Sequence, residues 1–315
     1  VAVTAFLRAP SPAEGASQPG LRHLLERVLL DPDHPAGAQA MRLRARGWRV
    51  LSFTTPDYTA YQVVGDKGSV GDALAFVRAL LAEPPLPAAS DADAEAALDR
   101  QRRAVGLAQG SSVPAHADQL QRLFAMAYEH HPGALPIVGT RETLGTYKPA
   151  ALRDLWQRTY RPHALTLVLS GAVPDAAVAT ARQGLQELGD AFARTRGRTS
   201  TSHTALPATA KVRSPERRPG PHIVLQAAAP EGAGGPPQMW LAFALDGATP
   251  AELSALEIAA QLPEPAAGEA SLVPGPFADQ SPGLFVLRTS NLGGDLADSI
   301  RSIADGVLRL PDSAT

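Results

Sequence analysis

A histidine and a glutamate stand three residues apart near the start of the chain, as His23 and Glu26, and Arg27 follows directly. In the pattern H-x-x-E-H, two histidines bind a zinc ion and the glutamate activates a water molecule. Here Arg27 stands at the second histidine position. A guanidinium stays protonated and has no lone pair to give to a metal. The segment therefore indicates either an altered zinc hydrolase or a hydrolytic site that has lost its metal.

The residues around this pattern predict a helix over 20–30. Five apolar residues recur at about 100° per residue and form one face, namely Leu21, Leu24, Leu25, Val28 and Leu29. His23, Glu26 and Arg27 fall on the opposite face, because residues three and four apart are neighbours on a helix. From there Arg27 could take the place of a metal and pair with Glu26. The same three side chains also suit the ordinary solvated face of an amphipathic helix.

The N-terminal half of the sequence resembles the pitrilysin/insulinase family of zinc metallopeptidases, in both the order and the spacing of its parts. The matching parts are the strand at 1–8, the G-x-x-H helix at 19–30, the strand pair at 47–61 that ends in Asp-x-Thr-x-Tyr, the helix at 74–87, and the segments 139–145, 152–156 and 160–173. No part is specific by itself. Their common order identifies the chain as similar to this family.

The resemblance assigns zinc-site roles residue by residue. His23 matches the first zinc histidine, Glu26 matches the general base, and Arg27 falls on the second zinc histidine. The third ligand of the family is a glutamate on a later helix. Ala108 aligns with it, and no Asp or Glu occurs from 100 to 117. Because catalytic zinc sites use three protein ligands, we expect no metal or other cofactor in this chain, and we expect zinc in a partner subunit.

The resemblance also implies a peptide-binding edge. An extended peptide is expected to add to one strand, at Val50, Leu51, Ser52, Phe53, Thr54 and Thr55. Leu51 falls where the family often has an asparagine near the bound substrate, so this strand has changed as well. The prediction is a strand that helps to bind peptide while the partner does the chemistry.

Four other histidines lie in the first half of the sequence: His34, His116, His130 and His131. The pair His130 and His131 stands in a Glu-His-His-Pro-Gly stretch that is typical of a turn. Adjacent residues do not share a face, so we interpret this pair as part of a solvated loop and not as a metal site.

Composition limits the function classes. The net charge is −2, so nothing favours binding to nucleic acid or to an anionic membrane. The absence of cysteine excludes disulfides, thiol catalysis and thiolate metal sites. No apolar run is long enough for a membrane span. The compartment stays open, with the bacterial periplasm preferred to the cytoplasm, and a signal peptide would lie outside a chain that begins at Val1.

The pattern of elements, together with the resemblance, predicts an α+β fold of two related domains, each a mostly antiparallel sheet with helices packed on one face. The first domain is expected at 1–193 and a linker rich in Arg, Thr, Ser and Pro at 194–220. The second domain, 221–315, is expected to be a shortened copy of the first. Its clearest element is a helix at 249–262, with Thr249 as the N-cap and Pro250 as the first residue.

Three functions fit these observations. The resemblance implies first a non-catalytic subunit, which pairs with a homologous active zinc-peptidase subunit and completes a chamber around the peptide. The second is an active zinc peptidase in which His23 and Glu26 work with unusual ligands. The third is a structural assembly subunit that binds no peptide. We prefer the first, because two ligands are lost at distant positions within a retained scaffold.

Overall fold

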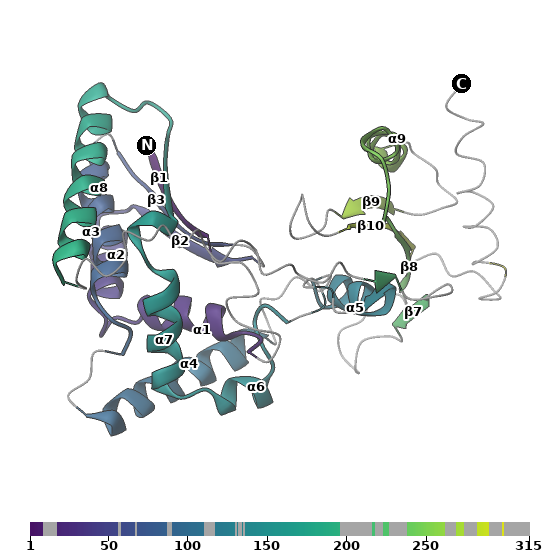
Figure 1. Ribbon diagram of the computed structural model, residues 1–315, viewed down its shortest axis with the longest axis horizontal. Coiled ribbons are helices and arrows are strands. Elements are labelled where there is room, and N and C mark those ends of the chain that lie inside the picture. Colours follow the sequence, from purple (N-terminus) through teal and green to yellow (C-terminus); the bar gives the residue numbers. More distant parts are fainter. Residues whose placement is uncertain are drawn as a thin grey trace. The chain divides into compact units, whose positions relative to one another are not determined.

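The computed structural model describes residues 1–8, 18–55, 58–66, 68–86, 90–109, 117–129, 131, 134, 136–195, 216–217, 223–226, 238–261, 269–273, 282–289 and 298. The chain divides into two compact units (Figure 1). The first consists of Val1–Pro114 and Leu135–Lys211, and the second of Ala115–Ala134 and Val212–Thr315. None of the helices within these described ranges is long and apolar enough to cross a membrane.

The first unit is built on a four-stranded sheet. Its strands are β1 (Ala2–Arg8), β2 (Arg49–Thr54), β3 (Tyr58–Val64) and β5 (Leu165–Ser170), in the order β2-β3-β1-β5. All three pairings are antiparallel, and Val3 lies opposite both Val63 and Leu169. These strands are rich in β-branched and aromatic residues, which suit a pleated, half-buried surface. β2 and β5 are the edges of this sheet.

Helices cover one face of this sheet. The helices of this unit are α1 (Leu21–Leu29), α2 (Pro35–Ala45), α3 (Ser69–Ala82), α4 (Asp91–Gln109), α6 (Arg141–Thr146), α7 (Pro149–Thr159) and α8 (Asp175–Thr195), and the short 3-10 helix η3 (Pro162–Ala164) precedes β5. Of these, α4 packs against α1 and α7, and α6 packs against α4. α3 packs between α2 and α8 (Figure 1). The apolar residues of the helices form one core with inward residues of the sheet such as Ala5 and Tyr61. The outward residues Leu51 and Phe53 stay exposed, as the period of two in a strand requires.

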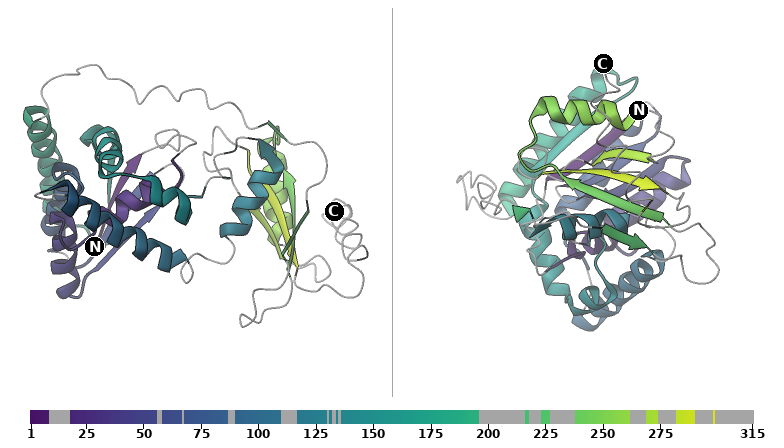
Figure 2. Two further views of the ribbon diagram at one scale, coloured as in Figure 1. Left: turned by 90° about the horizontal axis from the view of Figure 1, so that it is seen from below. Right: turned by 90° about the vertical axis from the view of Figure 1, so that its right-hand side faces the viewer.

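The second unit contains another four-stranded antiparallel sheet. Its strands are β7 (Ile223–Gln226), β8 (Gln238–Ala244), β10 (Leu284–Thr289) and β9 (Glu269–Val273), in the order β7-β8-β10-β9. One face packs against α9 (Pro250–Gln261) and the other against α5 (Ala117–Ala127) (Figure 2). The two-residue strands β4 (Tyr128–Glu129) and β6 (Glu216–Arg217) pair with each other.

The predicted α+β architecture with antiparallel sheets and helices is confirmed. The prediction of helices on one face only is wrong for the second sheet, which lies between α5 and α9. The predicted first domain, 1–193, includes the residues of α5. Its residues Leu123 and Phe124 instead pack against Trp240 in the second unit. Most of the predicted linker, 194–220, lies outside the described residues, so its limits and the second domain at 221–315 stay predictions.

His131 belongs to the core of the second unit, so its interpretation as a solvated loop residue is wrong. Its ring stacks against Phe124, with the ring centroids 4.4 Å apart, and against Tyr128 at 5.0 Å. Nε2 of His131 lies 2.9 Å from the carbonyl oxygen of Pro282. Burial lowers the pKa of His131, and the nearby carbonyl of Pro282 offsets only part of this effect. His116 and His130 lie outside the described residues.

His34 lies in the turn between α1 and α2. It is the N-cap of α2, where its Nδ1 accepts a hydrogen bond from the backbone N–H of Ala36 at 3.1 Å. Nε2 lies 3.3 Å from the carbonyl oxygen of Glu83, directly after α3. Only 1% of the residue is exposed. Burial lowers the pKa of His34 below the ordinary value of 6.5, although nearby carbonyl groups act in the opposite direction.

We expect His34 to make the first unit less stable as the pH falls below 6.5. The unfolded chain takes up this proton at a higher pH than the folded chain, so the stabilising contribution is complete above the unfolded pKa and is lost on acidification. His34→Asn keeps a capping acceptor and removes the titration. Urea unfolding at about pH 7.5 and about pH 5.5 should therefore show a smaller loss of stability for His34→Asn than for the unchanged chain. Equal losses would contradict this role.

Candidate functional site

The start of α1 is fixed by a close approach of two backbone segments. Gly20, the N-cap of α1, has a φ of 85°, which favours glycine. A Cβ atom at Gly20 would lie 2.5 Å from both Cα and N of Gly139, so the segment before α6 lies directly against the helix start. Oη of Tyr147 also donates to the carbonyl oxygen of Pro19 at 2.8 Å. These contacts determine where α1 presents His23 and Glu26.

The carboxylate of Glu26 is buried beneath β2, with 2% of the residue exposed. Oγ1 of Thr54 donates to its Oε2 at 2.5 Å, and Nδ1 of His23 lies 3.6 Å from the same oxygen. Burial raises the pKa of Glu26, but the neighbouring His23 and the hydroxyls of Thr54 and Ser52 outweigh burial, so the pKa lies below the ordinary value of 4.5. Glu26 is thus an ionised group that joins α1 to the edge strand.

Arg22 is a second buried charge on α1, and sequence reasoning gave it no role. It is 3% exposed, and its Nη2 donates to the carbonyl oxygen of Thr55 at 2.6 Å. Arginine is rarely buried this deeply unless it has a partner. The sequence around Arg22 shows no such partner, so nothing in it indicates that this side chain is buried. The guanidinium fastens the end of β2 to α1.

Two tyrosines lie beside these charges. The hydroxyl oxygens of Tyr61 and Tyr160 are 2.7 Å apart. Burial is the main cause that raises the pKa of both tyrosines, and the negative charge of Glu26 acts in the same direction, whereas Arg22 opposes it. We call five polar residues of this region the α1–β2 polar cluster: the buried Arg22, Glu26, Tyr61 and Tyr160, and the half-buried Thr54. Tyr61 ends the Asp-x-Thr-x-Tyr stretch of the sequence, which was the one signal for the tyrosine pair.

Arg27 does not enter the α1–β2 polar cluster. It is exposed and makes no ion pair with the described residues, so of the two alternatives for Arg27 the structure shows the solvated side chain and not the pair with Glu26. Consecutive residues on a helix point about 100° apart, and Glu26 is the one that faces the sheet. The alternative of a wholly solvated face does not hold for Glu26, which is buried. His23 is intermediate, with 23% of its side chain exposed.

These side chains do not fit a zinc ion. Within the described part of the chain, no group of three or more His, Asp or Glu residues could hold a metal. His23 and Glu26 are fewer than the three protein ligands of a catalytic zinc site, and Thr54 already binds the carboxylate of Glu26. Ala108 lies in the last turn of α4, and its side chain is outside the described set.

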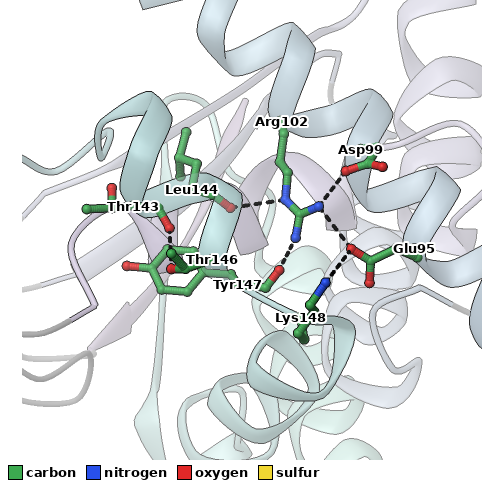
Figure 3. Close-up of polar contacts among 8 residues, drawn as sticks. All are labelled: Glu95, Asp99, Arg102, Thr143, Leu144, Thr146, Tyr147 and Lys148. Carbon is green, nitrogen blue, oxygen red and sulfur yellow. Dashed lines mark hydrogen bonds and ion pairs between the residues drawn. The ribbon is translucent and has the colours of Figure 1, made fainter.

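Arg102 holds α4, the helix that carries Ala108, in place (Figure 3). Its guanidinium is bound by two carboxylates and two backbone carbonyls, those of Glu95, Asp99, Leu144 and Tyr147. Nζ of Lys148 lies 3.4 Å from the same carboxylate of Glu95. The network ties α4 to α6 and to the start of α7, and α4 also packs against α1. The helix is therefore well anchored although it lacks the carboxylate that the resemblance implies at 108.

β2 forms the open edge above the α1–β2 polar cluster. Among the described strands it pairs only with β3, so its outer side can accept another strand. The predicted peptide-binding residues 50–54 all lie on this strand, and Thr55 follows it and turns towards Tyr58, to whose carbonyl oxygen its N–H donates at 2.8 Å. Val50, Ser52 and Thr54 alternate with the more exposed Leu51 and Phe53. Peptide binding by these residues stays a prediction.

Comparison with known proteins gives matches in structure alone. No protein-family model and no curated protein matches the sequence. A protease from Helicobacter pylori has a TM-score of 0.65 at 15% identity, and the match covers 96% of this chain and 72% of that chain. Pitrilysin has a TM-score of 0.59 at 18% identity, with 100% and 34% covered. An inactive domain of a peptidase M16 from Pseudomonas fluorescens has a TM-score of 0.59 at 17% identity, with 91% and 68% covered.

These matches establish a fold and leave activity open. The chain spans 34% of the length of pitrilysin, so the likeness concerns one part of that enzyme. The family resemblance seen in the sequence is confirmed at the level of structure. The chain has the fold of pitrilysin-type peptidase domains, a fold that also occurs in an inactive domain.

Proposed function

We propose that the chain is a non-catalytic subunit of a heterodimeric zinc peptidase and that it completes the peptide-binding chamber of a homologous active subunit. The observation that carries this proposal is the environment of Glu26. A general base must reach the water molecule that it activates, whereas Glu26 is buried and its carboxylate accepts a hydrogen bond from Thr54. Arg27 and Ala108 stand where the resemblance implies two further zinc ligands. The likeness to an inactive domain supports the same conclusion.

Peptide binding is assigned to the outer edge of β2. Main-chain hydrogen bonds to an edge strand hold an extended peptide with little dependence on its sequence. Arg22 and Glu26 fasten the far end of this strand to α1. In this proposal the α1–β2 polar cluster positions strand β2. The partner subunit supplies the zinc ion and its bound water.

Co-expression with a homologue that carries an intact H-x-x-E-H and the later glutamate tests the proposal. We expect a stable heterodimer that cleaves peptide, and we expect cleavage to stop when the partner's glutamate base is replaced by glutamine. Arg78→Glu, at an exposed position of α3, serves as a control variant of this chain that should leave cleavage unchanged. Peptide cleavage by this chain in the absence of the homologue would contradict the proposal.

Restoration of the second histidine tests the alternative of an active zinc peptidase. Arg27→His should give no hydrolysis, because Glu26 stays bound to Thr54 and no carboxylate stands at 108. Hydrolysis of a fluorogenic peptide with added zinc is the measurement, and the double variant Arg27→His with Ala108→Glu is the comparison. Cleavage by the single variant would show that the third ligand comes from another residue.

A further inference from the structure

The outer face of β2 carries three side chains of different chemistry in a row: Arg49, Leu51 and Phe53. We propose that this row selects the sequence of the bound peptide, with an acidic residue opposite Arg49 and β-branched or aromatic residues opposite Leu51 and Phe53. The proposal rests on the peptide-binding role given to β2 above and adds a sequence requirement to it.

The apolar part of the row is exposed yet held in place. Leu51 is 41% exposed and Phe53 is 43% exposed. The ring of Phe53 meets Tyr58 edge to face, with centroids 5.9 Å apart, and Tyr58 meets Phe6 in the same way at 5.4 Å. An aromatic row thus extends from the edge strand β2 across β3 to β1. A ring fixed in this way loses little conformational freedom when a peptide side chain packs against it.

The Arg49 end of the strand is positively charged. Arg49 is exposed and makes no ion pair with any described residue. Nη2 of Arg44 donates to the carbonyl oxygen of Val50 at 3.0 Å, so a second guanidinium lies at this end. The carboxylate of Asp72 is bound by Arg46 at 2.6 Å. An acidic peptide side chain would therefore meet uncompensated positive charge.

The register of an added strand follows from sheet geometry. Residues directly opposite each other in neighbouring strands place their side chains on the same face, and pairs of opposite charge or of aromatic with β-branched residues are stabilising. Antiparallel pairing is slightly the more stable arrangement. A bound peptide would then read apolar, any, apolar, any, acidic, from the residue opposite Phe53 to the residue opposite Arg49. The intervening side chains would face the side of Ser52 and α1.

A second copy of the same strand fits this face less well. Antiparallel pairing of β2 with itself, centred on Leu51, would place Arg49 opposite Phe53 and would supply no acidic group. The row therefore favours a foreign peptide over an edge-to-edge dimer.

Fluorescence anisotropy with labelled peptides tests the proposal. The probe is Thr-Val-Thr-Val-Thr-Glu-Thr, and its counterpart has Lys in place of Glu. We expect the Glu peptide to bind about fivefold more tightly to the unchanged chain, and Arg49→Glu to reverse the preference. Phe53→Thr should weaken both peptides about two- to fivefold. Arg78→Glu makes the same charge change on exposed α3 and should keep the preference for Glu.

The binding results test the sequence requirement separately from the subunit role. A reversed preference in Arg49→Glu supports the proposed row. Equal binding of both peptides by the unchanged chain, or a preference that Arg49→Glu leaves in place, overturns the sequence requirement and leaves the subunit role intact. Binding of neither peptide contradicts both the row and the peptide-binding part of the proposed function. The comparison of the two peptides needs no altered protein, so it holds even if a variant fails to fold.

Discussion

Replacement of Glu26 by alanine is expected to lower the free energy of unfolding by about 3 kcal/mol. The change removes the acceptor of the Thr54 hydroxyl and the negative charge beside Nδ1 of His23. The loss of a buried, hydrogen-bonded charged group is strongly destabilising, because its partners are left without the group that replaced water. Urea unfolding followed by tryptophan fluorescence measures the loss, since Trp48 and Trp156 both lie in the same unit as Glu26.

Two comparisons isolate the buried carboxylate. Glu187→Ala removes an exposed carboxylate from α8 and should change stability by about 0.5 kcal/mol or less. Acidification gives the second comparison. The pKa of Glu26 is lowered from 4.5, so its contribution is complete above that value and is lost as the pH falls through the folded pKa. The difference between the unchanged chain and Glu26→Ala should therefore shrink in acid. If Glu26→Ala lowers the free energy of unfolding as little as Glu187→Ala does, Glu26 does not stabilise the attachment of β2 to α1.

Substitution of Gly20 by alanine is expected to cost about 3 kcal/mol or more. The left-handed backbone at φ 85° accounts for about 1–2 kcal/mol of this. The remainder comes from the new Cβ, which would lie 2.5 Å from the backbone of Gly139 and would force the two segments apart. Because α1 begins here, the shift would also disturb the contacts of Glu26 with β2. The measurement is again the free energy of unfolding, together with the peptide affinity of the edge strand.

Gly47→Ala is the matched control for this glycine. Gly47 has a similar φ of 81°, but a Cβ there would meet no atom within 4 Å. We expect the free energy of unfolding of this variant to fall only by the cost of the left-handed backbone, about 1–2 kcal/mol. The difference between the two variants measures the close approach of the segment at 139 to the start of α1. Equal losses would contradict that approach.

Local patterns in the sequence predicted most of the elements near the site. The helices predicted at 20–30 and 249–262 agree with α1 and α9 to within one residue at each end, because apolar periodicity and proline at the first helical position are local signals. α6 was missed, since six residues are too few to show a helical period. The packing of α5 on the second sheet was also missed. An amphipathic pattern shows which face of a helix is buried, but it does not show which sheet the helix packs on.

The site itself was predicted only in part. The spacing of His23 and Glu26 identified this pair, and the resemblance assigned peptide binding to the strand at 50–55, but neither predicted that β2 lies beside the pair. The burial of Arg22 depends on the carbonyl of Thr55, 33 residues further along the chain, and no local pattern records such a contact. The pairing of Tyr61 with Tyr160 spans 99 residues and was missed for the same reason. His131 was misread because its two stacking rings are placed by the packing of the second unit.

The zinc content of the isolated chain distinguishes a metal-free subunit from a zinc enzyme. The chain is expressed without any homologue, incubated with zinc, freed of excess metal and analysed by mass spectrometry. Because a guanidinium and a methyl group stand in place of two ligands, the chain should retain no more zinc than an unrelated protein without a metal site. A single tightly held zinc per chain that disappears in His23→Ala would contradict it.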